Sequence, residues 1–298
     1  MKTFFLSRTG SILLVLMSML SLTLGASLAK TLFETAGPSG VTVARLGLGA
    51  LILCTFWRPW RFRLSMKEKK AILFYGICLG FMNLLFYLAI ARLPIGLAIA
   101  IEFTGPLTVA LLYSKKAVDL LWAFLAALGI VLILPIHSLG SLAGKIDIAG
   151  VFFALGAAAA WALYIILGKR AGRSTPAGAV TALGTLTAFL AIAPFGLHET
   201  SALFGSGSLL FVALCVGLLS SAIPYSLEMF ALRQLPEKYF SLLMSLEPAI
   251  GAMVAFSFLG EKLTWLQGLA VVSVISASVG SSLTNPKPEP TPSEPLPS

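Results

Sequence analysis

Charged residues are scarce in this 298-residue chain. They make up 11% of the sequence, hydrophobic residues make up 58%, and the mean hydropathy is +0.95. Ordinary soluble domains are about one quarter charged, so this composition excludes a soluble globular protein. A helix that crosses the hydrocarbon core of a membrane needs roughly 20 apolar residues. The chain therefore has room for many such helices and little room for a soluble domain.

Cysteine is also rare, and the motifs of several catalytic classes are missing. Cys54, Cys78 and Cys215 lie in apolar segments without a CxxC pair or a nearby histidine, which predicts packing residues rather than a disulfide or a metal site. The sequence contains no GxxxxGK[ST], HExxH or GxSxG motif, which disfavours ATP-driven transport and hydrolysis inside the membrane. We expect neither an enzyme nor a bound cofactor or metal.

The basic residues do not form a nucleic-acid site. The formal net charge is +9, but the Lys and Arg residues occupy short loops between apolar runs, whereas nucleic-acid binding requires them on one water-facing patch. Charges near the ends of the runs, Asp119 among them, are assigned to topology and solubility. The lipid bilayer is the expected partner, and nucleic acid is not.

Apolar runs separated by charge, glycine and proline predict an all-α membrane protein with ten transmembrane helices. Short connections favour antiparallel neighbours. If the N-terminus is cytoplasmic, 16 of the 21 Lys and Arg residues fall on the cytoplasmic side, as the positive-inside rule requires, and the C-terminus is cytoplasmic too. The predicted spans are residues 11–29, 39–57, 71–91, 95–113, 118–136, 148–167, 176–195, 208–231, 238–258 and 264–283.

The two ends of the chain carry separate predictions. Residues 1–10 are expected to form a short cytoplasmic N-terminus. Lys2 and Arg8 before an apolar run that ends in Ser27-Leu28-Ala29 also resemble a secretory signal with a cleavage site. That run is long for a signal core. Residues 284–298 hold six prolines in fifteen positions, which predicts a disordered cytoplasmic tail.

Helix-breaking residues recur in the same order when the sequence is offset against itself. At an offset of 142 the matches are Leu93-Pro94 with Leu235-Pro236 and Pro106 with Pro248, and at 138 they are Pro38-Ser39-Gly40 with Pro176-Ala177-Gly178. The matches divide the chain into two repeats of five spans, residues 11–136 and 148–283. Because five is odd, the two repeats have opposite orientations in the membrane, as in many secondary transporters. Chance recurrence of proline and glycine is the alternative.

Carboxylates inside the predicted spans mark a candidate site. A charge near the bilayer centre costs on the order of 2.5 to 3.5 kcal/mol, so its presence suggests a function. Glu102 and Glu247 lie near the middle of their spans, and each is followed closely by a proline. Proline leaves the carbonyl four residues earlier without its donor. Helix breaks are predicted at Pro106, Pro224 and Pro248.

A carboxylate beside such a break can hold a cation or a proton. The alternative is a structural pair across a helix interface that touches no substrate. Arg45, six residues into the second span, can receive a substrate carboxylate through two parallel hydrogen bonds, or its side chain can extend to the outer interface. Glu228 is expected near the cytoplasmic end of the eighth span, in contact with interfacial water.

Several segments resemble a known family. They are Gly25-Ala26-Ser27-Leu28-Ala29-Lys30, Glu102-Phe103-Thr104-Gly105-Pro106-Leu107, Pro224-Tyr225-Ser226-Leu227-Glu228-Met229 and Leu243-Met244-Ser245-Leu246-Glu247-Pro248. Over residues 11–284 the chain resembles the ten-span EamA-type branch of the drug/metabolite transporter superfamily, most closely its amino-acid exporters. The resemblance implies two inverted five-helix repeats around a central cavity, a location in the bacterial inner membrane, and efflux of small amino acids such as threonine and homoserine.

On this basis we interpret the chain as a secondary carrier that exports small hydroxy amino acids, coupled to inward movement of protons. Glu102 or Glu247 would receive the substrate ammonium or a proton, and Arg45 or backbone donors at the proline breaks would hold its carboxylate. Further candidates for the site are Asn83, Thr104, Tyr225, Ser226 and Ser245. The alternatives are a carrier of the same fold for another metabolite or drug, and a membrane receptor or assembly protein that transports nothing.

Overall fold

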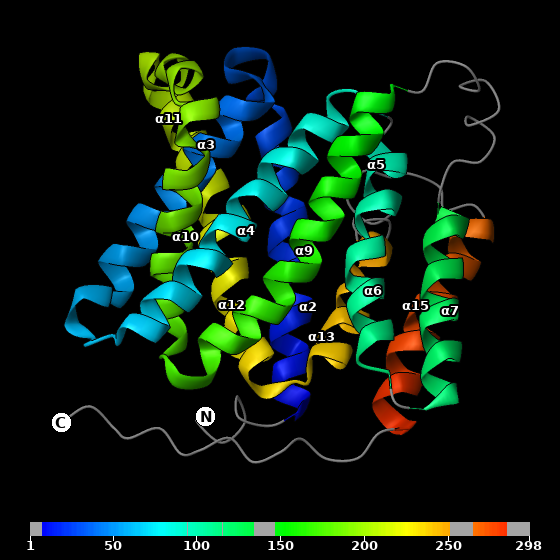
Figure 1. The fold of residues 1–298 in the computed structure, drawn as a ribbon. Coiled ribbons are helices and arrows are strands. Elements are labelled where there is room, and N and C mark those ends of the chain that lie inside the picture. Colours follow the sequence, from blue (N-terminus) through cyan, green and yellow to red (C-terminus); the bar gives the residue numbers. More distant parts are fainter. Residues whose placement is uncertain (1–7, 94, 115, 134–146, 251–264, 285–298) are drawn as a thin grey trace.

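The fold is a bundle of helices, seen in a computed structural model that describes residues 8–93, 95–114, 116–133, 147–250 and 265–284 (Figure 1). No strand occurs within these ranges. Six helices are long and apolar enough to cross a membrane, counted over the described residues alone. Residues 285–298 of the predicted Pro-rich tail, residues 251–258 of the ninth predicted span and residues 134–146 lie outside them.

The N-terminal part of the chain supplies three long helices followed by shorter ones. In order, these elements are α2 (Arg8–Lys30), α3 (Phe33–Trp57), η1 (Pro59–Arg61), α4 (Met66–Ile90), α5 (Ile95–Glu102), α6 (Thr104–Leu112) and α7 (Ala117–Ile133). The helix α3 begins earlier than predicted because it runs through Pro38. A kink at Gly37, which has a φ of 58°, makes this possible.

The C-terminal part has a similar series. Its elements are α9 (Ile148–Ser174), α10 (Ala177–Ile192), η3 (Ala193–Phe195), η4 (His198–Gly205), α11 (Gly207–Gly217), η5 (Leu218–Ala222), α12 (Ile223–Gln234), α13 (Glu237–Met244) and α15 (Trp265–Thr284). The helix α2 begins and α15 ends on the same side of the bundle (Figure 1).

Three helices are interrupted next to prolines. Proline has no N–H to donate to the carbonyl four residues earlier. Pro106 therefore leaves the carbonyl of Glu102 free, and α5 ends at Glu102. Pro248 does the same at Met244, where α13 ends. Before Pro224, the five-residue π-helix η5 separates α11 from α12.

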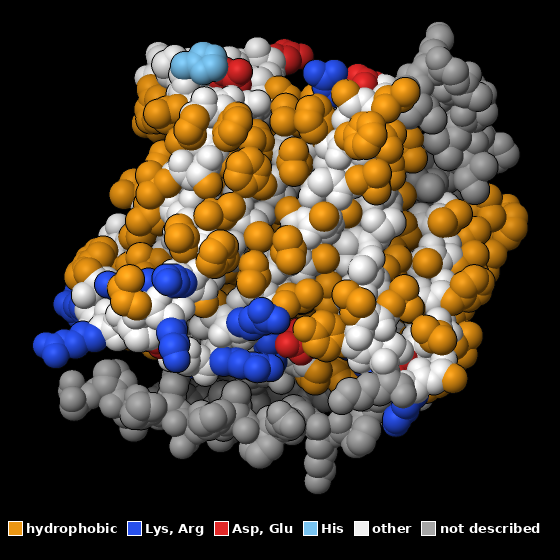
Figure 2. Space-filling view, in the orientation of Figure 1, with side chains coloured by type: hydrophobic (Ala, Val, Ile, Leu, Met, Phe, Trp, Pro, Cys, Tyr) orange, Lys and Arg blue, Asp and Glu red, His pale blue; other side chains and the backbone are white. Residues whose placement is uncertain are grey.

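Glycines allow the helices to pack closely. A Cβ on Gly76 of α4 would lie 2.5 Å from the carbonyl oxygen of Gly184 on α10, and one on Gly25 of α2 would lie 2.7 Å from Ser220 in η5. Contacts this short are sterically forbidden, so only glycine fits at these crossings. Hydrophobic side chains cover the middle of the visible face, and Lys and Arg gather at the edge where α2 begins (Figure 2).

Candidate functional site

Arg45 is the centre of a buried polar cluster. Its side chain projects from α3, and the residue is 3% exposed. Its Nη2 donates to the Asn83 Oδ1 and, at 3.4 Å, to the Tyr225 hydroxyl. Tyr225 in turn donates to the Asn83 Oδ1 at 2.9 Å, and the guanidinium lies 5.0 Å from the ring centroid of Tyr87. The predicted residues Arg45, Asn83 and Tyr225 therefore form one network that joins three helices.

The proline break at Pro224 supplies another part of this network. Pro224 cannot donate to the carbonyl of Ser220, and that oxygen accepts a hydrogen bond from Arg45 Nη1 at 3.0 Å instead. An unpaired carbonyl inside a membrane protein costs several kcal/mol. The guanidinium removes this cost and is itself held in place, so Arg45 does not extend to the outer interface.

Arg45 Nε and Glu247 Oε2 are the charged members of a larger set of buried side-chain atoms that have no hydrogen-bond partner among the described residues. Glu102, at the end of α5 and 7% exposed, interacts electrostatically with both Arg45 and Glu247. One free donor on a cation and one free acceptor on a carboxylate thus belong to residues that interact electrostatically with a second carboxylate. Such an arrangement is suited to a zwitterion, which carries one group of each charge.

The burial of Glu228 differs from what the sequence predicts. The residue was expected near interfacial water, but it is 3% exposed. Its Oε2 accepts a hydrogen bond from the Tyr164 hydroxyl at 2.8 Å, and Tyr164 stacks on Tyr75 with ring centroids 5.2 Å apart. Glu228 also interacts electrostatically with Glu247. The helix α12 extends to Gln234, so Glu228 lies deeper than a span ending at residue 231 would suggest.

The remaining predicted residues donate their hydroxyls to backbone carbonyls three or four residues earlier in the chain. Ser226 donates to the carbonyl of Ala222 at 2.7 Å, and buried Ser245 donates to that of Ser241 at 3.3 Å. Thr104 is exposed and donates to the carbonyl of Ile101 at 2.6 Å. None of these hydroxyls donates to the Arg45 network, although each keeps an acceptor lone pair.

A large pocket lies apart from Arg45 and the buried glutamates. It has a volume of about 980 Å³ and follows α3 and α10, and neither Arg45 nor the buried glutamates line it. No group of three or more potential metal ligands occurs in the part of the chain that the structure describes.

Sequence reasoning missed Glu228, Tyr164, Tyr87 and the Ser220 carbonyl as members of the buried polar region. A signal for Ser220 was present, because a proline four residues later identifies a carbonyl that needs a partner. Tyr87 and Tyr164 gave no comparable signal, since aromatic residues in membrane helices are more often packing residues.

Comparison with known proteins gives two kinds of match. Over 273 residues the chain is 48% identical to the threonine/homoserine exporter RhtA of Salmonella typhimurium strain LT2, and the alignment covers 92% of this chain and 91% of that protein. The same exporter from Escherichia coli strain K12 is 47% identical over the same length and shares. The model of the EamA-like transporter family matches residues 148–283.

The fold also matches a solved crystal structure. That structure superposes with a TM-score of 0.75 at 16% sequence identity, over 93% of this chain and 98% of the other. At this identity the match concerns the fold alone.

Proposed function

Because this chain belongs to the EamA-like transporter family, we propose that it is a secondary carrier that exports threonine, homoserine and similar small amino acids across the bacterial inner membrane. It is a multi-pass membrane protein and a transporter rather than an enzyme. The substrate class follows from the names of its relatives, which are 47% and 48% identical to it.

The observation that carries the proposal is the pair of buried, unpartnered polar atoms. Arg45 Nε would donate to the substrate carboxylate, and Glu247 Oε2 would accept from its ammonium group. Glu102 lies within electrostatic range of both. Burying these groups without partners is costly, and a bound zwitterion would offset that cost. Asn83 and Tyr225 hold the guanidinium in position and lie close enough to hydrogen-bond a substrate hydroxyl beside it.

The proposed architecture is ten spans in two inverted repeats, residues 11–136 and 148–283, with both termini in the cytoplasm. The helix breaks support it. The helix α5 runs from Ile95 to Glu102 and α13 from Glu237 to Met244, so both ends of α13 lie 142 residues after those of α5. The family model covers the second of these repeats, residues 148–283.

Helix packing also supports a two-fold relation between the halves. The third span packs on the sixth as α4 on α9, and the eighth packs on the first as α12 on α2. These are equivalent contacts if the halves are related by two-fold symmetry. Three further contacts join equivalent spans of the two halves: the second and seventh as α3 with α10, the fourth and ninth as α6 with α13, and the fifth and tenth as α7 with α15.

Proton coupling completes the proposal. A carboxylate that binds the substrate ammonium in one state and a proton in the other would exchange the two across the membrane. Glu247 is the first candidate because its free oxygen has no competing donor among the described residues. Glu102 is the second.

The test is export of labelled threonine and homoserine from cells and from proteoliposomes with an imposed proton gradient. The wild-type chain should increase release, and Glu247→Gln should reduce gradient-driven release at least tenfold, about 1.4 kcal/mol, because an amide cannot carry the exchanged proton. Glu34→Gln, at an exposed position, is the control and should transport normally.

Preference for another metabolite would appear as weak competition by threonine and strong competition by that compound. Equal release with and without well-expressed wild-type chain would reject transport of these amino acids. A Glu247→Gln protein with normal gradient-driven release would reject the proposed role of Glu247.

A further inference from the structure

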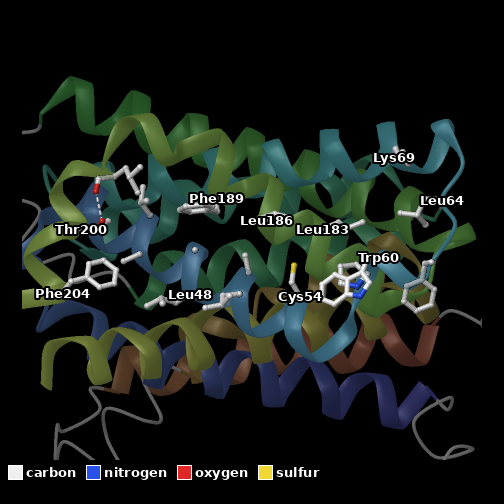
Figure 3. A pocket seen from close by; sticks show the side chains of 18 of the residues that line it. Leu48, Cys54, Trp60, Leu64, Lys69, Leu183, Leu186, Phe189, Thr200 and Phe204 are labelled. Atoms are coloured by element: carbon white, nitrogen blue, oxygen red, sulfur yellow. Dashed lines mark hydrogen bonds between the residues drawn. The ribbon is translucent and has the colours of Figure 1, made fainter. Parts of the chain in front are cut away.

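The apolar pocket along α3 and α10 is a groove whose lining residues do not include Arg45. Figure 3 shows the side chains that line it. Apolar side chains line most of it, including Leu48, Leu183, Leu186 and Phe189. Leu51, on its rim, is 62% exposed. Inside a bilayer such a surface is in contact with lipid, but a depression of about 980 Å³ holds a molecule in a defined position rather than a fluid layer.

The length of the groove along α3 suits one acyl chain. The helix α3 contributes lining residues from Val43 to Cys54, a stretch of about 16 Å at 1.5 Å per residue. The hydrocarbon core is about 30 Å thick, so this part of the groove spans about one leaflet.

The two ends of the groove differ in charge. Arg63 and Lys69 line one end, beside Leu64 and the 69%-exposed Trp60. Within the described ranges, neither the Arg63 nor the Lys69 side chain has a hydrogen-bond or ion-pair partner. The other end is lined by Thr200 and Phe204, without a charged residue. A tryptophan beside basic residues is typical of the membrane interface, where lipid headgroups lie.

We propose that this groove binds one anionic phospholipid. Its phosphate would pair with Arg63 and Lys69, and an acyl chain would lie between α3 and α10 toward Val43. Charge complementarity distinguishes this occupant from its rivals. A zwitterionic lipid brings a cation of its own to the same place, and an apolar helix of a second copy would leave both basic side chains unpaired.

The experiment uses the full chain in detergent with two lipids of identical acyl chains, phosphatidylglycerol and phosphatidylcholine. Native mass spectrometry counts the lipids that stay bound. The wild-type chain should retain phosphatidylglycerol about tenfold better, since each basic residue near a headgroup favours an anionic lipid. The double variant Arg63→Gln/Lys69→Gln should lose this preference.

Arg61→Gln/Lys70→Gln is the matched control. It removes the same charge from the same stretch of chain, residues 61–70, but neither residue lines the groove, so the preference should remain. A groove variant that keeps the wild-type preference would overturn the proposal. Replacement of lipid adducts by a species of twice the chain mass would overturn it in favour of a second copy.

A second measurement leaves Arg63 and Lys69 unchanged, so its result does not depend on whether the double variant folds. Phosphatidylglycerol brominated near the headgroup end of its acyl chains should quench the fluorescence that Trp60 contributes, measured as the difference from Trp60→Phe. Brominated phosphatidylcholine at the same mole fraction should quench it less. Equal quenching by the two lipids would contradict an anionic site.

Discussion

The guanidinium of Arg45 is held from three directions. Its Nη1 donates to the Ser220 carbonyl and its Nη2 donates to Asn83 and Tyr225, while Nε has no partner among the described residues. Arginine is suited to this because its donors form a rigid planar fork. A lysine at the same position would carry the charge, but its single nitrogen would have to replace the donors that arginine distributes over three nitrogens.

We therefore predict that Arg45→Lys raises the substrate concentration for half-maximal export at least tenfold. Each hydrogen bond to a charged group is worth about 1.5 to 3 kcal/mol, and a lost bond to the substrate carboxylate would reduce affinity accordingly. Concentration dependence of export in vesicles measures the effect. If Arg45 only stabilises the fold, the amount of folded protein and the maximal rate should fall while the half-saturating concentration stays the same.

At the scale of residues, the sequence predicted which residues belong to the polar site better than it predicted their hydrogen-bond partners. Midspan depth and a nearby proline identified Glu102 and Glu247 as unusual residues, and a charge inside a predicted span identified Arg45. Their partners come from helices far apart in the sequence, for example Asn83 and Tyr225 from α4 and α12, and no local pattern encodes such a contact. Glu228 was misplaced for a simpler reason, because a change of a few residues in the end of a helix shifts the depth of every side chain near it.

At the scale of elements, the crossing of α4 and α10 depends on Gly76. A Cβ at this position would lie 2.5 Å from the Gly184 carbonyl oxygen and from the Thr187 side chain, and a backbone oxygen cannot move aside. We predict that Gly76→Ala lowers the unfolding free energy by about 1 to 3 kcal/mol, the range for overpacking. Thermal or SDS-induced unfolding measures it.

Gly268→Ala is the control, since nothing lies within 4 Å of the added Cβ in α15. Alanine is a better helix former than glycine, so this variant should be as stable as the wild type or slightly more stable. Equal losses in the two variants would mean that the α4–α10 crossing tolerates a methyl group.

An ion pair between the end of α4 and the start of α9 should make the stability of the protein depend on pH. Asp147 caps α9 by accepting from the backbone N–H of Ala149 at 2.8 Å, and it forms an exposed ion pair with Arg92 at 3.1 Å. The hydrogen bond from Arg92 lowers the pKa of Asp147. A depressed pKa contributes stability above the ordinary carboxyl range, near 4, and that contribution is lost as the pH falls through the folded-state value.

Acidification from about pH 6 to about pH 3 should therefore lower the unfolding temperature of the wild type slightly more than that of Asp147→Asn. Asparagine keeps the cap but does not titrate. Asp147→Ala should be less stable at both pH values, because it loses the cap as well. An identical acid response of wild type and Asp147→Asn would contradict a role for the ion pair.

At the scale of the whole molecule, apolar runs and prolines predicted much of the helical layout. The long helices lie within or around the predicted spans, because a segment in lipid must satisfy its backbone internally and a helix does so. What sequence could not give is how the helices pair. Pairing depends on close approaches such as Gly25 against Ser220, and a small residue alone does not specify its neighbour.

Asp119 and Lys238 form an ion pair that joins the two halves. Their side chains are only 1% and 9% exposed, and Lys238 Nζ lies 3.0 Å from Asp119 Oδ2. Asp119 was expected to serve topology and solubility near a span end. Burial changes its role. A buried ion pair is strongly coupled, because removing one member leaves an uncompensated charge in a medium of low polarity.

Lys238→Met should therefore lower the unfolding free energy by about 3 to 5 kcal/mol. Asp119→Asn, which leaves the ammonium of Lys238 without its carboxylate, should also be costly. The double variant should lose less than the sum of the two, with a coupling of about 1 to 3 kcal/mol, because neither charge then remains. Asparagine can still accept the backbone N–H of Lys116, which Asp119 binds at 3.1 Å, so the start of α7 stays intact in this cycle. Additive losses would show that α7 and α13 are stabilised separately, and that the pair does not couple the two halves.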